Sequence, residues 1–188
     1  MKNLIYNLKQ KSGKTQLFSP ALIKQALPVL LLIILFLIST QNLKAQNIKE
    51  YSDLANSITS ADKQNGSSEA KHLKSLIFDL NPKIYIYNKE DKRYGNEPPV
   101  CLNTDVNSIE RLYEANNLFE KVELISININ NPSELNFILD FSKLNSFINL
   151  KYVQFLCSFE CDPILIKQLY KENSKTGMIV FYRISLPE

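Results

Sequence analysis

Two stretches of the sequence decide the fold: LISINI at residues 124–129 and LKYVQF at residues 150–155. Both fit the pattern L-x-x-φ-x-φ, where φ is an aliphatic or aromatic residue, and they begin 26 positions apart. A further apolar segment at 178–184 follows after about 27 residues, and 100–102 comes before them by a similar step. Such a period is typical of a unit made of one strand and one return segment, which buries its apolar face only by stacking on its neighbours. The sequence therefore predicts side-by-side strands in chain order, and right-handed connections would make them parallel.

This pattern, over roughly residues 98–186, resembles the leucine-rich repeat family, in which L-x-x-L-x-L strands line one face of a parallel sheet. The asparagine that usually follows the strand has a counterpart in Asn130 or Asn131, but Cys157 and Ser158 stand there in the next unit. The fold class that we predict is α/β: a short leucine-rich-repeat-like stack of about four units of parallel strands with helical or irregular returns, preceded by two N-terminal helices. An ordinary small α/β sheet with crossovers of similar length is the alternative that stays open.

The expected elements follow from hydrophobic periodicity and from helix start signals. Asn107 with Glu110 three residues later makes a capping box, and Asp162-Pro163 is a well-formed helix start. Residues 133–149 are expected to be irregular or to form short helical turns. We expect helices over 48–60, 68–80, 107–119 and 163–173, and strands over 84–87, 100–102, 122–129, 150–159 and 178–185.

The N-terminal 45 residues have the order of a secretory signal peptide. A Lys-bearing segment, residues 1–24, precedes the apolar run Ala26–Ile38, and small-residue cleavage is expected after Ala45. At ~1.5 Å per residue the run spans only about 20 Å as a helix, which is short for a bilayer core of about 30 Å. We therefore predict a signal peptide over 1–45 and one mature domain over 46–188, comprising N-terminal helices and a first strand (46–97) and the repeat region (98–188). A retained membrane anchor is the alternative.

Composition narrows the classes of partner. The chain has 188 residues with 22 Lys and Arg against 19 Asp and Glu, but six lysines and no acidic residue fall in the first 45 positions. The remainder therefore carries 16 basic and 19 acidic residues. A mildly acidic body does not favour nucleic acid, because binding phosphates requires a concentrated basic face. The single histidine, His72, does not favour histidine-based metal sites or catalysis.

Three cysteines in an exported chain suggest one disulfide and one free thiol. Cys157 and Cys161 lie four residues apart, and two interpretations stay open for them: a disulfide across a turn, or two reduced thiols in the core. Cys101 is expected two strands from Cys157, at about 10 Å, beyond the ~7 Å reach of a disulfide between Cα atoms. We expect Cys101 to be buried. A zinc site from the three cysteines and His72 is disfavoured because the paired C-x-x-C spacing is missing.

Strict alternation along the strands predicts a face that is free to contact another protein. If Ile125, Ile127 and Ile129 point into the core, the intervening side chains point the other way. Tyrosine and amides interleaved on such a row suit protein contact, although a solvated face or one covered by the N-terminal helices is the plain alternative. The candidate interaction face consists of Ser126, Asn128, Asn130, Tyr152, Gln154 and Leu156.

We therefore predict an exported protein, periplasmic or extracellular, that acts as a non-catalytic protein- or envelope-interaction module without a cofactor or metal. No catalytic residue is assigned, because carboxylates such as Glu97, Asp105, Glu160 and Asp162 have no recognisable pairing in the sequence. The expected partner is another protein or an envelope component, with no nucleic acid, and a membrane only if residues 26–38 stay uncleaved. Two alternatives stay open: an exported hydrolase with an unrecognised carboxylate site, and a membrane-anchored accessory protein.

Overall fold

The structure, a computed structural model, describes residues 48–61, 65–171 and 177–186. The predicted signal peptide, with its apolar run and cleavage site, lies outside these residues. Residues 46–188 form a single unit. Within the described ranges, no helix is both long enough and apolar enough to cross a membrane.

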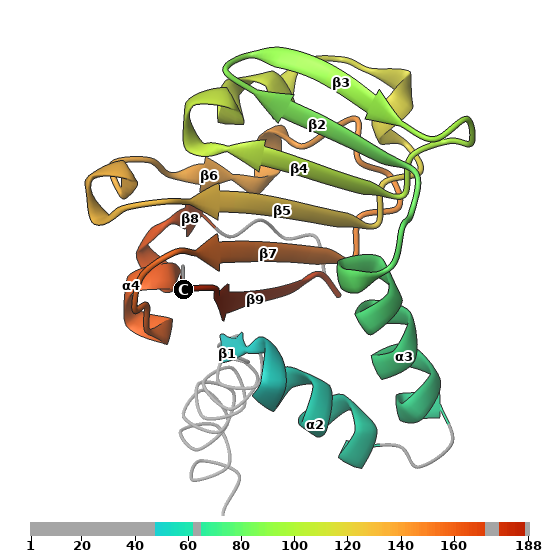
Figure 1. The fold of residues 1–188 in the computed structure, drawn as a ribbon, viewed down its shortest axis with the longest axis vertical. Coiled ribbons are helices and arrows are strands. Elements are labelled where there is room, and N and C mark those ends of the chain that lie inside the picture. The colour runs from blue at the N-terminus through green and yellow to red at the C-terminus, as the bar shows by residue number, and fades with distance from the viewer. Residues whose placement is uncertain (1–47, 62–64, 172–176, 187–188) are drawn as a thin grey trace, which may run out of the picture. The chain divides into compact units, whose positions relative to one another are not determined.

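The centre of the structure is a mixed but mostly parallel seven-stranded sheet in the order β1-β9-β7-β5-β4-β2-β3 (Figure 1). The α/β class with parallel strands is therefore confirmed. The strands are β1 (Lys49–Glu50), β2 (Lys83–Tyr87), β3 (Glu90–Tyr94), β4 (Cys101–Asp105), β5 (Leu124–Ile129), β7 (Tyr152–Cys157) and β9 (Ile179–Ile184). All neighbouring pairs run parallel except β2 and β3, which form a hairpin.

The register corrects the repeat spacing. The 26-residue step in the sequence pairs Leu124 with Leu150, but Leu124 lies opposite Tyr152, two residues later. Successive strands align at steps of 23, 28 and 27 residues, from Cys101 to Leu124 to Tyr152 to Ile179. Because side chains alternate with a period of two, a two-residue shift leaves every side chain on its predicted face. The face assignment therefore survives although the predicted pairing was wrong.

Strand β3 was not predicted. Its sequence, EDKRY, is exposed at every position and charged at all but Tyr94, so it lacks the apolar alternation that marks a strand. Asn88 and Lys89 adopt positive φ angles of 53° and 64°, the conformation that closes a two-residue hairpin turn. A charged edge strand of this kind discourages pairing with another chain.

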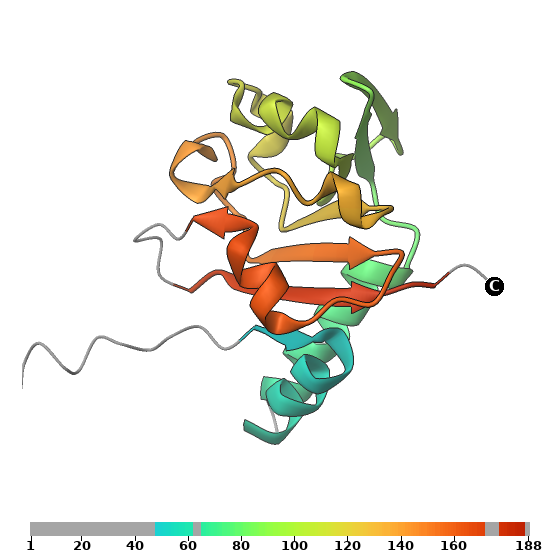
Figure 2. The same ribbon diagram turned by 90° about the vertical axis from the view of Figure 1, so that its left-hand side faces the viewer.

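The return segments pack on one face of the sheet and follow one another along it (Figure 2). They contain η2 (Val106–Tyr113), η3 (Asn117–Phe119), η4 (Pro132–Glu134), β6 (Leu139–Asp140), η5 (Phe141–Lys143), α4 (Pro163–Gln168) and β8 (Tyr170–Lys171). Strands β6 and β8 pair in parallel as a second, two-stranded sheet.

Two of the predicted return helices differ from the observed ones. Residues 107–119 form two 3-10 segments, and the residue before the first is Asp105, whose side chain makes no capping bond, so the capping box at Asn107 was wrong. A 3-10 helix rises about 2.0 Å per residue against 1.5 Å for an α-helix, so it covers the length of a strand with fewer residues. The predicted helix 163–173 ends at Gln168, because the chain then enters β8 and pairs with β6.

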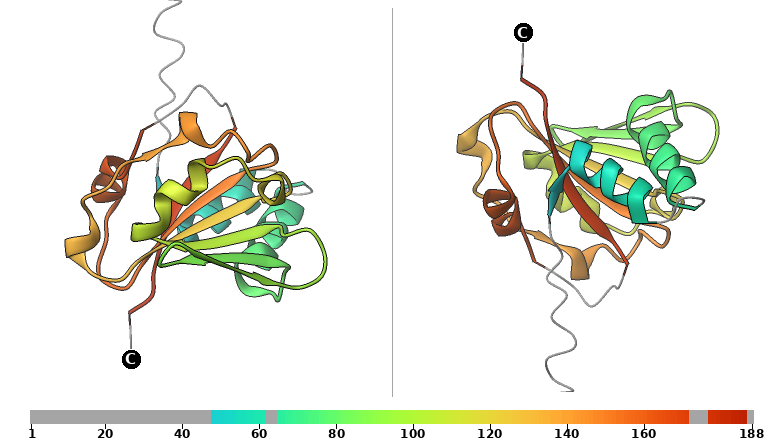
Figure 3. Two further views of the ribbon diagram at one scale, coloured as in Figure 1. Left: turned by 90° about the horizontal axis from the view of Figure 1, so that it is seen from above. Right: turned by 90° about the horizontal axis from the view of Figure 1, so that it is seen from below.

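Helices α2 (Tyr51–Ala61) and α3 (Asn65–Phe78) lie on the opposite face of the sheet from α4 (Figure 3). The predicted helix 48–60 begins later, since Lys49 and Glu50 pair with β9 instead. Two apolar cores result. The larger one joins the sheet to the returns, and the smaller one joins Leu54, Leu73 and Leu76 of the helices to Cys101, Leu124, Tyr152 and Phe181 of the sheet.

Candidate interaction face

The face of the sheet that carries α2 and α3, which we call the outer face, presents three rows of side chains that follow the register of the strands. The helix-covered row consists of Cys101, Leu124, Tyr152 and Ile179. The middle row consists of Tyr85, Asn103, Ser126, Gln154 and Phe181. The polar row, at the carboxyl ends of the strands, consists of Tyr87, Asp105, Asn128, Leu156 and Arg183.

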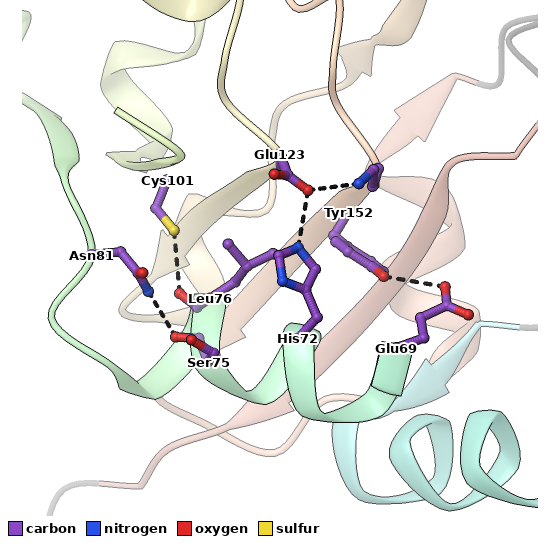
Figure 4. Close-up of polar contacts among 9 residues, drawn as sticks. Glu69, His72, Ser75, Leu76, Asn81, Cys101, Glu123 and Tyr152 are labelled. Atoms are coloured by element: carbon purple, nitrogen blue, oxygen red, sulfur yellow. Dashed lines mark hydrogen bonds and ion pairs between the residues drawn. The ribbon is translucent and has the colours of Figure 1, made fainter. Parts of the chain in front are cut away.

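Polar contacts fasten α3 onto the helix-covered row (Figure 4). The Glu123 carboxylate lies 3.0 Å from His72 Nε2 and accepts a hydrogen bond of 2.8 Å from Lys151 Nζ. Partial burial acts to raise the pKa of Glu123, but the hydrogen bonds from Lys151 and His72 outweigh it and hold this pKa below its usual value. These contacts place α3 over the start of the strands.

Tyr152 is one of the residues that hold α3 on the sheet, so it does not lie on a free surface. Its side chain is 2% exposed, and its hydroxyl donates a hydrogen bond of 3.2 Å to Glu69 of α3. Burial, followed by the charge of Glu69, raises the pKa of this hydroxyl. The candidate face predicted from the sequence therefore loses Tyr152, because the helices cover the row in which it stands.

Ser126 and Gln154 make the centre of the middle row polar, and we call this pair the polar floor of the face. The Ser126 hydroxyl donates a hydrogen bond of 2.9 Å to Gln154 Oε1, and the two side chains are 5% and 2% exposed. Gln154 Nε2 has no partner within the described residues. A buried polar atom without a partner costs about 1–3 kcal/mol, so this amide is held at a cost to folding.

At one end of the polar row, Asp105, Tyr87 and Asn128 lie together. Asn128 Nδ2 donates a hydrogen bond of 2.7 Å to the Tyr87 hydroxyl, and Asp105 Oδ2 accepts one of 3.1 Å from the backbone amide of Asn88. Burial, then the neighbouring Tyr85 and Asp105, raises the pKa of Tyr87, which keeps its hydroxyl protonated. Asp105 Oδ1 and Asn128 Oδ1 are left without partners in the described part of the chain.

At the other end of the polar row, Arg183 lies against aromatic rings. Its guanidinium carbon is 5.0 Å from the centre of the Phe78 ring, and Phe78 packs edge-on against Tyr51 at 5.6 Å between ring centres. Burial lowers the pKa of Arg183, because it removes water from the charged guanidinium. Arg183 forms no ion pair with any described carboxylate, and its Nε has no hydrogen-bonding partner among the described residues.

Four buried polar atoms that lack partners in the described ranges thus lie on the middle and polar rows of the outer face: one each from Asp105, Asn128, Gln154 and Arg183. Native proteins pair most buried polar groups, so such a cluster is unusual. Leu156, the apolar member of the polar row, belongs to neither apolar core. This part of the sheet has hydrogen-bonding capacity, charge and apolar area that the described chain itself does not use.

The structure brings together four of the six residues predicted for the face. Asn128 and Leu156 lie half-buried on the polar row, whereas Ser126 and Gln154 lie on the middle row and are about as buried as Tyr152. Asn130 lies in the exposed loop after β5, where its backbone amide donates to Glu134 Oε2. Sequence reasoning missed Tyr87, Asp105 and Arg183, although an arginine inside the apolar segment 178–185 was a signal for the last of these.

The structure joins Cys157 and Cys161 by a disulfide, with their Cα atoms 6.6 Å apart, which selects one of the two interpretations left open by the sequence. Cys101 is a free cysteine on the other face of the sheet, fully buried, and its Sγ donates to the Leu76 carbonyl. Because two of the three cysteines are bonded to each other and Cys101 lies apart from them, they do not form a zinc site with His72. Within the described residues no group of three metal-ligating side chains comes together.

The cysteines give a direct chemical prediction. Burial raises the pKa of Cys101 to about 11, so at pH 8 almost none of it is the reactive thiolate. We expect the folded protein to take up no iodoacetamide at pH 8, the denatured protein one equivalent, and the denatured and reduced protein three, as measured by mass spectrometry. Three equivalents without reduction would contradict the disulfide, and rapid labelling of the folded protein would contradict the burial of Cys101.

The carboxylates named from the sequence do not converge on one site. Glu97 lies in the loop after β3, where its backbone carbonyl accepts from Arg93. Asp162 caps α4 by accepting a hydrogen bond of 2.8 Å from the Leu165 amide, as predicted. Glu160 is exposed beside it, whereas Asp105 is at the end of β4. Helix capping accounts for Asp162, and Asp105 is the only one of the four on the outer face.

A shallow hollow of about 410 Å³ lies among the returns, away from the outer face, and is lined by Leu135, Asn136, Phe137, Ile138, Leu165, Gln168 and Leu169. None of these side chains is titratable, so the hollow offers no acid, base or nucleophile. Four of the described residues that have a buried polar atom without a partner lie instead on the outer face. Comparison of the chain with models of protein families, with curated proteins and with solved structures found no match.

Proposed function

We propose that this chain is an exported protein-interaction module, built as a short leucine-rich-repeat-like stack, that binds another protein or envelope component through the outer face beyond α2 and α3. The stack is supported by four strands, β4, β5, β7 and β9, that are neighbours in chain order, with every return between them on one face. A second parallel pair, β6 and β8, runs through these returns.

The observation that carries the binding function is the cluster of unpaired buried polar atoms on Asp105, Asn128, Gln154 and Arg183. Each unpaired group costs about 1–3 kcal/mol. The four atoms are themselves covered, so a bound partner recovers that free energy by drawing the side chains round to meet it. In open α/β sheets, ligands also bind at the carboxyl ends of the strands, which is where the polar row stands.

The export part of the proposal has two supports: the order of charged, apolar and small residues over 1–45, and the Cys157–Cys161 disulfide, which is typical of an oxidising compartment. N-terminal sequencing of the protein from its own cell is expected to begin at Gln46. A sequence that begins at Met1 would contradict cleavage and would favour a retained membrane anchor.

Photocrosslinking in the native cell tests the binding face. A benzoylphenylalanine placed at Leu156, in the polar row, is expected to form a discrete covalent adduct with a partner. The same group at Ile148, 72% exposed in the turn before β7, is the matched control and is expected to form none. Adding Asn128→Arg, which puts a bulky charge beside Leu156, should abolish the adduct. Equal adducts from both positions, or none from Leu156, would refute the proposed face.

A further inference from the structure

Two opposite charges stand in the polar row, three strands apart. Asp105 ends β4, and Arg183 is the matching residue of β9, with Asn128 and Leu156 between them. The ion pairs found in the described ranges involve other residues, so neither charge is neutralised by a described partner. The row therefore offers a carboxylate that can bind a cation and a guanidinium that can bind an anion, at a fixed separation.

Arg183 is already arranged for an anion. Stacking of its guanidinium on Phe78 restricts the side chain, so that less conformational entropy remains to be lost on binding. A planar guanidinium matches the two oxygens of a carboxylate in a bidentate pair. Since Arg183 is partly buried, its attraction for an anion is screened less than that of a surface lysine.

The spacing of the two charges selects the shape of the ligand. From β4 to β9 there are three strand-to-strand steps of ~4.8 Å, or about 14 Å. An extended peptide advances about 3.3 Å per residue and alternates its side chains, so residues i and i+4 point the same way about 13 Å apart. Residue i+2 then lies over the amide of Asn128 and the aliphatic side chain of Leu156, where a small side chain fits.

We infer that the polar row binds an extended peptide segment of the partner that crosses the strands, with a basic side chain over Asp105 and an acidic side chain over Arg183 four residues away. This inference rests on the proposed function and specifies its ligand. A neutral saccharide would leave both charges uncompensated. An acidic saccharide would compensate Arg183 but not Asp105. A polypeptide supplies both signs on one backbone.

Synthetic peptides test this directly. The probes are fluorescent eleven-residue peptides of alanine and serine with one lysine and one glutamate two, four or six positions apart, made in both orders. We expect fluorescence anisotropy to show the highest affinity for the peptides with the four-residue spacing. Arg183→Gln, or glutamine in place of the peptide glutamate, should weaken binding about tenfold or more, the value of one charge-assisted hydrogen bond. The two changes together should cost no more than either alone.

The control variant is Arg93→Gln. Arg93 lies opposite Ile84 on the other face of the sheet, so its loss should leave peptide affinity unchanged. The inference is overturned if peptide affinity does not depend on the spacing of the two charges, or if it falls equally in Arg93→Gln. It is also overturned if uronic-acid oligosaccharides bind more tightly than the peptides and this binding depends on Arg183. If no peptide binds but the Leu156 crosslink forms, the peptide inference fails and the proposed function stands. If the crosslink is also missing, both fail.

Discussion

Replacing Phe155 by alanine is expected to lower the free energy of unfolding by about 3–5 kcal/mol, the range for removing a buried aromatic ring. Phe155 is fully buried at the centre of β7, between Ile127 of β5 and Tyr182 of β9. Its ring lies 6.4 Å from that of Phe137 and 6.2 Å from that of Tyr170, so it joins the sheet to two different return segments. The change leaves a cavity that both layers line.

Urea denaturation measures this loss. Ile148→Ala, at a site 72% exposed, is the matched control and should change stability by no more than about 0.5 kcal/mol. If Phe155→Ala does not fold at all, Ile127→Val removes a single methylene from the same layer and should cost about 0.5–1.5 kcal/mol. A loss below about 1 kcal/mol for Phe155→Ala would mean that the returns do not pack on the sheet as described.

The second large effect is expected from the buried pair Ser126 and Gln154. Ser126→Ala alone should destabilise the protein by about 1–3 kcal/mol, because Gln154 then has no described partner at either end of its amide. The double variant Ser126→Ala with Gln154→Met should recover this loss and be at least as stable as the wild type. Replacing both members of a buried polar pair by apolar groups is nearly neutral or stabilising, and it also removes the unpaired Nε2.

A double-mutant cycle from urea denaturation gives the coupling between the two residues, and the Leu156 crosslink gives the cost to binding. We expect the double variant to keep its stability and to lose its adduct, since the polar floor of the face is gone. A double variant that is less stable than Ser126→Ala would show that the polar pair serves folding. Stability that exceeds the wild type with an undiminished adduct would remove Gln154 from the binding face.

The parallel strands and their faces were predictable from the sequence, because they depend on local alternation. Ile125, Ile127 and Ile129 alternate with polar residues, and one layer of packing is enough to fix their direction. The same holds for the Asp162 cap, which needs only its own helix. Local signals of this kind do not depend on which strands become neighbours.

The features that the sequence could not supply are those set by contacts between distant segments. The true offset between β5 and β7 depends on how many residues the intervening return uses, and the motif spacing misjudged it by two. Tyr152 was assigned to a free surface because nothing local shows that α3, about 80 residues earlier, brings Glu69 to its hydroxyl. Arg183 and Asp105 become members of one row only when β9 and β4 are placed in the same sheet.

The binding face and the predictions made for it depend on β5 and β7 being parallel neighbours, since that alignment builds the polar row. Backbone NMR measures it most directly through nuclear Overhauser effects between the two strands. The parallel register predicts contacts from Ile125 to Val153 and from Ile127 to Phe155, in the same order along both strands. Contacts in the reverse order, from Ile125 to Phe155 and from Ile127 to Val153, or no contacts between these strands, would contradict the fold and the binding face built on it.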